Sequence, residues 1–191
     1  THLWFALMCI AIAAYVIAKA GAYQSESAEV LVSHRRWELS FAVVLFMFFP
    51  WFVREYTGRR SPWLPAGFTL LMAVVLMANL LLTYGVAYVR LPEFSLLSLP
   101  WGERVAALRV PQEQQSAWFR VGRLGMILVL IYGLHASWRQ YRHGERRRAL
   151  TLTIAIAVFL ALVLFNQLVN HGIIDFIHTA EFGFLALLLV M

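Results

Sequence analysis

The sequence contains few charged residues and a single cysteine, and these shortages narrow the class of protein. Charged residues make up 14% of the 191 residues, whereas a soluble domain carries roughly 25%. The lone Cys9 excludes an internal disulfide and a metal cluster held by several cysteines. The sequence also has no glycine-rich phosphate loop, nucleophile elbow or zinc-protease motif. Disulfide-rich secreted domains and the enzymes that carry those motifs are therefore excluded.

Long apolar runs fill the rest of the chain, of which 61% is hydrophobic. A bilayer core about 30 Å thick needs about 20 apolar residues per helix. The runs are continuous rather than alternating, which favours helices over barrel strands. We therefore predict an all-α integral membrane protein, a single domain over residues 1–191. Its six transmembrane helices are expected at residues 3–22, 37–53, 63–89, 121–138, 149–169 and 173–191.

The arginines predict which side of the membrane each loop faces. Five of them lie within residues 139–148 and three more within 54–62, and such short basic loops favour the cytoplasm. We therefore expect both chain ends in the cytoplasm of a bacterial inner membrane, and residues 23–36 and 90–120 outside. In the outer loop 90–120, a short β-hairpin or an irregular loop is expected around the turn at 100–103. Membrane-flanking arginines contact lipid headgroups, so no nucleic-acid partner is predicted.

Buried polar residues are concentrated in the outer halves of the helices. The two asparagines of the fifth helix are four residues apart and share a face, and the tight turn at Gly172 makes the fifth and sixth helices antiparallel neighbours. We predict an outer-half polar pocket between the third, fifth and sixth helices. The candidate ligand-binding or switch residues are Lys19, Asn79, Tyr84, Asn166, Asn170, His171, Asp175, His178 and Glu181.

Glu181 is the residue of this pocket for which the sequence supports the most specific hypothesis. It is expected roughly 10–12 Å below the outer end of its helix, where an ionisable group costs about 2.5–3.5 kcal/mol unless it is paired. Its candidate partners are His178, Lys19 and Asn79. A Glu181–His178 pair is an element that protonation could switch. The alternative is a static network of interhelical hydrogen bonds that holds the bundle together.

A metal or haem site is a second interpretation of the same residues. His171, Asp175 and His178 are of the types that bind zinc or iron. However, their spacing matches no known metal motif, and Gly172 separates the two histidines. A haem with two axial histidines needs both at similar depth, and His135 lies too deep to pair with either of them. We therefore predict no cofactor, with a metal- or haem-binding oxidoreductase as the alternative function.

Several short segments resemble the multi-pass N-terminal membrane regions of bacterial sensor proteins, especially PAS-containing sensor histidine kinases. They are Phe-Val-Arg-Glu-Tyr at 52–56, the asparagine in Met-Ala-Asn-Leu at 77–80, Gly-Glu-Arg-Val at 102–105, Trp118, and the arginine-rich stretch 138–149. In that family a further helix often precedes this stretch, which gives seven. The start at Thr1 without an initiator methionine and the end inside an apolar run are expected of a piece of a longer protein.

The resemblance implies a function for the whole segment. We expect a non-enzymatic signal-input module, in which a lipid-soluble or small-molecule ligand shifts the helices and the last helix passes the change to a cytoplasmic output domain such as a histidine kinase. Sensor kinases are usually dimers, so a homodimer is expected by analogy. A transporter subunit is the remaining alternative, although the apolar inner half argues against it.

Overall fold

The computed structural model describes residues 2–59, 61–91, 93–98, 102, 104–109 and 116–170, without most strand side chains and those of residues 166–170. Within this part of the chain, five helices are long and apolar enough to cross a membrane. The protein is therefore a helical bundle compatible with a multi-pass membrane protein. Its elements are α1 (His2–Tyr23), α2 (Ala28–Tyr56), α3 (Trp63–Leu81), β1 (Glu93–Ser98), β2 (Arg104–Arg109), α4 (Ala117–Arg142) and α5 (Arg146–Asn170).

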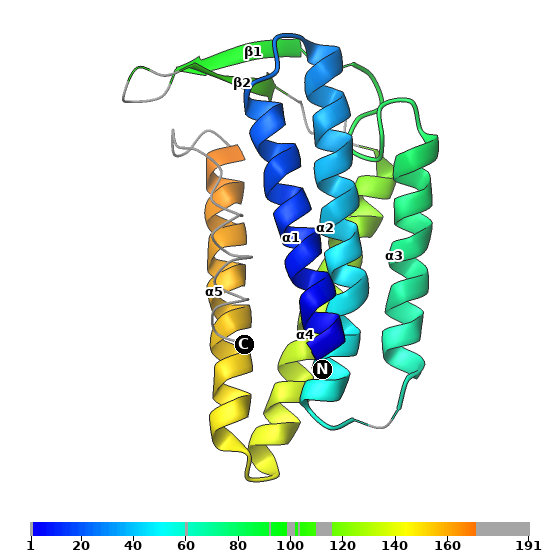
Figure 1. Cartoon of the computed structure of the whole chain (residues 1–191), viewed down its shortest axis with the longest axis vertical. Helices are drawn as coiled ribbons and strands as arrows, with labels where there is room; N and C mark the ends of the chain where they lie inside the picture. The colour runs from blue at the N-terminus through cyan, green and yellow to red at the C-terminus, as the bar shows by residue number, and fades with distance from the viewer. Residues whose placement is uncertain are drawn as a thin grey trace.

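The helices run alternately up and down, and α2 lies at the centre (Figure 1). It packs against α1, α3 and α4, while α5 packs against α4. The two ends of the bundle differ, and we name them by what they carry. The strand end holds β1, β2 and the α1–α2 turn, and the arginine end holds the α2–α3 and α4–α5 turns (Figure 1).

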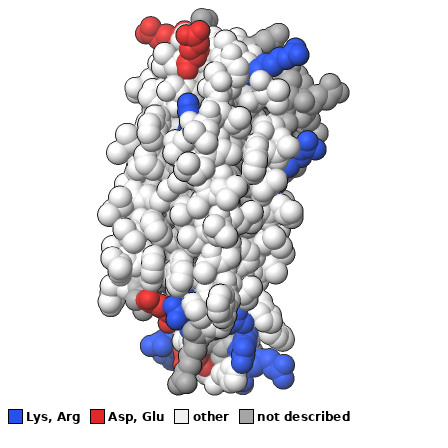
Figure 2. Space-filling model, turned by 90° about the vertical axis from the view of Figure 1, so that its right-hand side faces the viewer, with Lys and Arg blue, Asp and Glu red and all other residues white. Residues whose placement is uncertain are grey.

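Large apolar side chains from all five described helices form one core, to which α3 contributes Met72. Phe49 and Val53 of α2, Met8 of α1, Val129 of α4 and Ile156 of α5 are each at most 2% exposed. Other large apolar residues point outward, and Trp63 is 82% exposed. The surface shows a broad uncharged band between two charged ends (Figure 2). An apolar belt of this kind fits the hydrocarbon core of a bilayer.

Two helices differ clearly from their expected bounds. The helix expected at 37–53 begins at Ala28, because the Ser27 side chain accepts from the Val30 amide and caps a first turn that also carries Glu29. Hydropathy alone assigned this charged first part to a loop. The helix expected at 63–89 ends at Leu81. The other three described helices begin and end within four residues of their expected bounds.

The loop 90–120 contains the two strands, which pair antiparallel from Glu93 opposite Arg109 to Ser98 opposite Arg104. Gly102, between them, has a φ of +89°, a backbone conformation that glycine adopts without steric cost. Ala106 of β2 is buried against Ala22 of α1 and Leu31 of α2, with Phe94 beside them. The strands therefore rest on the ends of α1 and α2.

The predicted sixth helix, residues 173–191, and the turn at Gly172 lie outside the described residues.

Candidate functional site

The structure places only part of the predicted pocket. Lys19 and Asn79 are 3% and 0% exposed, respectively, and Tyr84 is half-buried. Asn166 and Asn170 lie on α5, but their side chains are outside the described set. The remaining predicted residues lie outside the described part of the chain, namely His171, Asp175, His178 and Glu181. The described polar contacts near Lys19 and Asn79 lie instead between α1, α2 and α3.

A charged cluster, buried except for part of Arg35, joins α1 to α2 near the strand end, and we define it as Tyr15, Lys19, Arg35 and Glu38. Arg35 Nη1 donates to both carboxylate oxygens of Glu38, at 2.6 and 2.5 Å. Lys19 interacts electrostatically with the same carboxylate, and the Tyr15 hydroxyl is hydrogen-bonded to it. Glu38 and Lys19 are each 3% exposed. One carboxylate is thus shared by two cations from different helices.

Aromatic rings surround the lysine of the charged cluster. Lys19 Nζ lies 5.8 Å from the ring centroids of both Tyr15 and Tyr23, which is within the range of cation–π attraction. These residues lie one turn apart along α1, so the ammonium group is held between two rings of its own helix. Arg35 also interacts electrostatically with Tyr88. Burial without pairing would be costly, and the cluster supplies the compensating charges and rings.

Asn79 connects α3 to α2 at the same end. Its Nδ2 donates to the Arg36 carbonyl and to Ser40 Oγ, both at 2.9 Å, and its Oδ1 accepts from the Val86 amide at 2.9 Å. The Arg36 guanidinium in turn donates to the carbonyls of Asn79, at 2.8 Å, and Leu80. The Asn79 amide therefore joins the end of α3 both to α2 and to the turn that follows α3.

These contacts also explain why α3 is shorter than expected. Arg36 satisfies carbonyls that a continuing helix would bond internally, and Asn79 holds the amide of Val86 after the turn. Gly85 has a φ of +68°, and a Cβ there would come within 2.7 Å of Asn79 Oδ1. The chain therefore leaves the helix at Leu81. Tyr84, which was expected on the helix, lies in the following turn.

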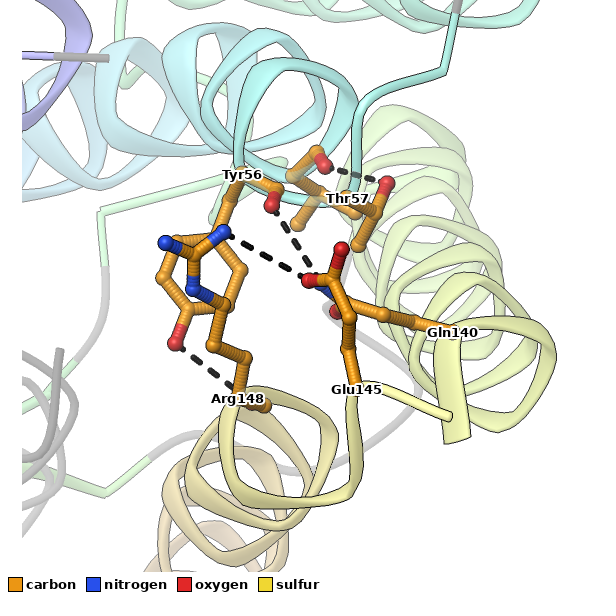
Figure 3. A network of polar contacts seen from close by, with 6 residues as sticks. Tyr56, Thr57, Gln140, Glu145 and Arg148 are labelled. Atoms are coloured by element: carbon orange, nitrogen blue, oxygen red, sulfur yellow. Dashed lines mark hydrogen bonds and ion pairs between the residues drawn. The ribbon is translucent and has the colours of Figure 1, made fainter. Parts of the chain in front are cut away.

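A second polar network closes the arginine end (Figure 3). Gln140 Nε2 donates to Glu145 Oε2 at 2.9 Å and to the Tyr56 carbonyl at 3.5 Å. Arg148 pairs with Glu145 at 3.4 Å, and the Tyr56 hydroxyl donates to the Arg148 carbonyl. Nearby, Ser137 Oγ bonds the Ala149 carbonyl at 2.6 Å. This network joins the C-terminal ends of α2 and α4 to the start of α5.

Several residues that complete the two networks were not predicted from the sequence. Arg35 and Arg36 were assigned to a loop, although Arg35 and Glu38 are three residues apart, a spacing that places them on one helix face. Gln140 at the arginine end was not singled out, because it lies among other polar residues at the end of its helix. No signal local to the sequence pairs Arg36 with Asn79, since 43 residues separate them.

Among the described residues, no group of three or more His, Cys, Asp or Glu side chains is placed to hold a metal ion. The residues proposed for a metal or haem lie outside that part of the chain, so this alternative stays a prediction. Comparisons with models of protein families, with curated proteins and with solved structures found no match for this chain.

Proposed function

We propose that this chain is the signal-input region of a bacterial membrane sensor, with its strand end outside the cell and its arginine end in the cytoplasm. A ligand or membrane cue acts at the strand end and favours one arrangement of α1 and α2. The helices pass that change to the arginine end, and from there to a cytoplasmic output domain. The resemblance to sensor membrane regions motivates this proposal.

The buried charged cluster is the observation that carries the proposal. An ionisable group inside a membrane bundle is by default a functional-site candidate. Here Glu38 pairs with Arg35 of its own helix and also interacts with Lys19 of α1, so a shift of α1 along α2 moves Lys19 relative to the Arg35–Glu38 pair. Separating a buried charge from its partner is costly. The cluster therefore makes the free energy of the bundle depend on the position of α1 relative to α2.

The strands provide a route from outside to this cluster. Ala106 of β2 packs on Ala22, three residues after Lys19, and on Leu31, four residues before Arg35. A ligand that moves the strands therefore moves the helix ends that hold the cluster. It can shift the equilibrium only by binding the two helix arrangements with different affinity.

The first test is to read the parent gene beyond Met191 and to assay the domain found there in membrane vesicles. We expect a histidine kinase or another signalling domain. Glu38→Gln removes the shared charge while keeping the side-chain size, and we expect it to change the basal output by about fivefold or more. Glu29→Gln is the matched control, because Glu29 is on the same helix and exposed.

Two results would contradict the proposal. A stop codon directly after Met191 would leave no output domain for this region to control. Equal output from the wild type, Glu38→Gln and Glu29→Gln, at equal protein abundance in the membrane, would show that the charged cluster only holds the helices together.

A further inference from the structure

A cleft of about 640 Å³ opens at the arginine end, between the last turns of α2 and α4 and the first turn of α3. This volume is within the range of small-molecule and headgroup sites. The cleft is distinct from the charged cluster of the strand end and does not depend on the signalling role proposed above. Its wall includes Thr57, Arg59, Tyr132, Arg139, Gln140 and His143.

The cleft lies in a strongly basic region. The described residues of this end include seven arginines against Glu55 and Glu145. Glu145, which also lines the cleft, is already engaged by Gln140 and Arg148 (Figure 3). Two helix C-termini and two helix N-termini meet here, so their dipoles largely offset one another. The guanidinium groups of Arg59 and Arg139, both in the cleft wall, therefore make the cleft attract negatively charged ligands.

Two buried polar atoms in the wall lack a hydrogen-bond partner among the described residues, namely the Tyr132 hydroxyl and Gln140 Oε1. Both side chains are only 6% exposed, and leaving a buried polar atom unsatisfied costs about 1–3 kcal/mol. The rest of each side chain is held in place. Arg59 lies over the Tyr132 ring at 5.3 Å, and Gln140 Nε2 is bonded to Glu145.

These atoms specify the chemistry of a ligand that would fit the cleft. A phosphate accepts from the Tyr132 hydroxyl and forms charge-assisted, often two-pronged, hydrogen bonds with arginine. Gln140 Oε1 accepts, so it needs a donor on the same ligand, a hydroxyl or an ammonium group. We infer that this cleft binds an anionic phosphate ester that also carries a hydroxyl or ammonium donor.

A phospholipid headgroup and a soluble phosphate ester both have this chemistry, and both can reach the cleft. Tyr132 lies ten residues before the end of α4, or about 15 Å along the helix, so the cleft reaches from the charged rim into the bundle. Leu64, on its wall, is 55% exposed. A phospholipid headgroup can therefore enter from the membrane, and a soluble phosphate ester from the aqueous side.

The test uses the purified protein and three probes. Native mass spectrometry measures retention of phosphatidylglycerol, which has a phosphate and hydroxyl donors, against phosphatidylcholine, which has a phosphate but no donor. Titration calorimetry in detergent measures glycerol 3-phosphate, a phosphate monoester that also carries hydroxyl donors but has no acyl chains. We expect phosphatidylglycerol to be retained over phosphatidylcholine if the source is lipid, and glycerol 3-phosphate to bind if the source is soluble.

Matched variants locate the binding. The Arg59→Gln, Arg139→Gln double variant should weaken binding of the preferred probe by at least about tenfold. The Arg142→Gln, Arg147→Gln double variant removes the same charge from exposed positions outside the cleft wall and should leave binding unchanged. Tyr132→Phe keeps the ring beneath Arg59 and should weaken binding about three- to tenfold.

The inference is overturned by any of three results. The first is that neither phosphatidylglycerol nor glycerol 3-phosphate binds. The second is that phosphatidylcholine is retained as well as phosphatidylglycerol while glycerol 3-phosphate does not bind. The third is that both double variants weaken binding equally. The last result would mean that the general positive charge of this end attracts anions without a site. Because Tyr132→Phe changes a single hydroxyl, it keeps the test decisive if the arginine variant fails to fold.

Discussion

Lys19 and Asn79 illustrate how far single residues can be interpreted from the sequence. A lysine and an asparagine inside long apolar runs predict buried polar contacts, and both side chains are buried. Their partners were not predicted, because Arg35, Arg36 and Glu38 approach them through the packing of α2. Polarity in an apolar run is a local signal, whereas the identity of a partner depends on which helix faces it.

Asn79→Leu should destabilise the bundle by about 1–3 kcal/mol, since it removes three hydrogen bonds and leaves the Val86 amide without its partner. The free energy of unfolding in mixed detergent micelles measures the loss. Thr83→Val is the control, because Thr83 is exposed in the turn that follows α3. If the two variants are equally stable, the Asn79 network contributes no net stability.

Helix α2 shows, at the scale of an element, that local sequence does not predict tertiary contacts. Apolar residues define its middle, and the sequence predicted a helix there, but its first nine residues include the charged Glu29, Arg35 and Arg36. They are helical because Ser27 caps them and because Arg35 and Arg36 bond Glu38 and the end of α3. Hydropathy finds the part of a helix that is inside the bilayer, whereas capping and tertiary contacts decide where the helix ends.

Close helix packing provides a test at this scale. A Cβ on Gly133 of α4 would lie 2.8 Å from Ile156 Cδ1 of α5 and 3.3 Å from Phe49 Cε1 of α2. Gly133→Leu should therefore lower the thermal midpoint, with a cost of about 1–3 kcal/mol.

Gly67→Leu is the matched control, because a Cβ there meets no heavy atom within 4 Å among the described residues. Both changes place leucine in a helix, so helix propensity cancels in the comparison. An equal thermal midpoint for the two variants would mean that α2, α4 and α5 are more loosely packed than the structure shows.

The whole molecule has its charges at two ends and an uncharged band between them (Figure 2). The band and the five membrane-length helices agree with the predicted multi-pass membrane protein. The orientation of the two ends relative to the cytoplasm stays a prediction from the arginines of the short loops. The pocket predicted between the third, fifth and sixth helices also stays a prediction, because most of its residues lie outside the described chain.

Cysteine labelling tests the orientation. In a Cys9→Ser background, Glu26→Cys places a thiol at the strand end and His143→Cys places one at the arginine end, both at exposed positions. We expect a membrane-impermeant maleimide to label position 26 in intact spheroplasts, and position 143 only after the membrane is opened. A permeant maleimide should label both. The reverse pattern would mean that the arginine end faces outward.

The sequence by itself determined that the chain forms apolar helices of membrane-spanning length, where the middle of each described helix lies, and which turns carry the arginines. These features follow from the cost of placing polar groups in hydrocarbon, which each segment meets on its own. Only the tertiary structure decided that Glu38 is shared by Lys19 and Arg35, that Asn79 and Arg36 end α3, and that Tyr132 and Gln140 line a basic cleft. Such contacts join distant parts of the chain, and their energies depend on how the helices pack against one another.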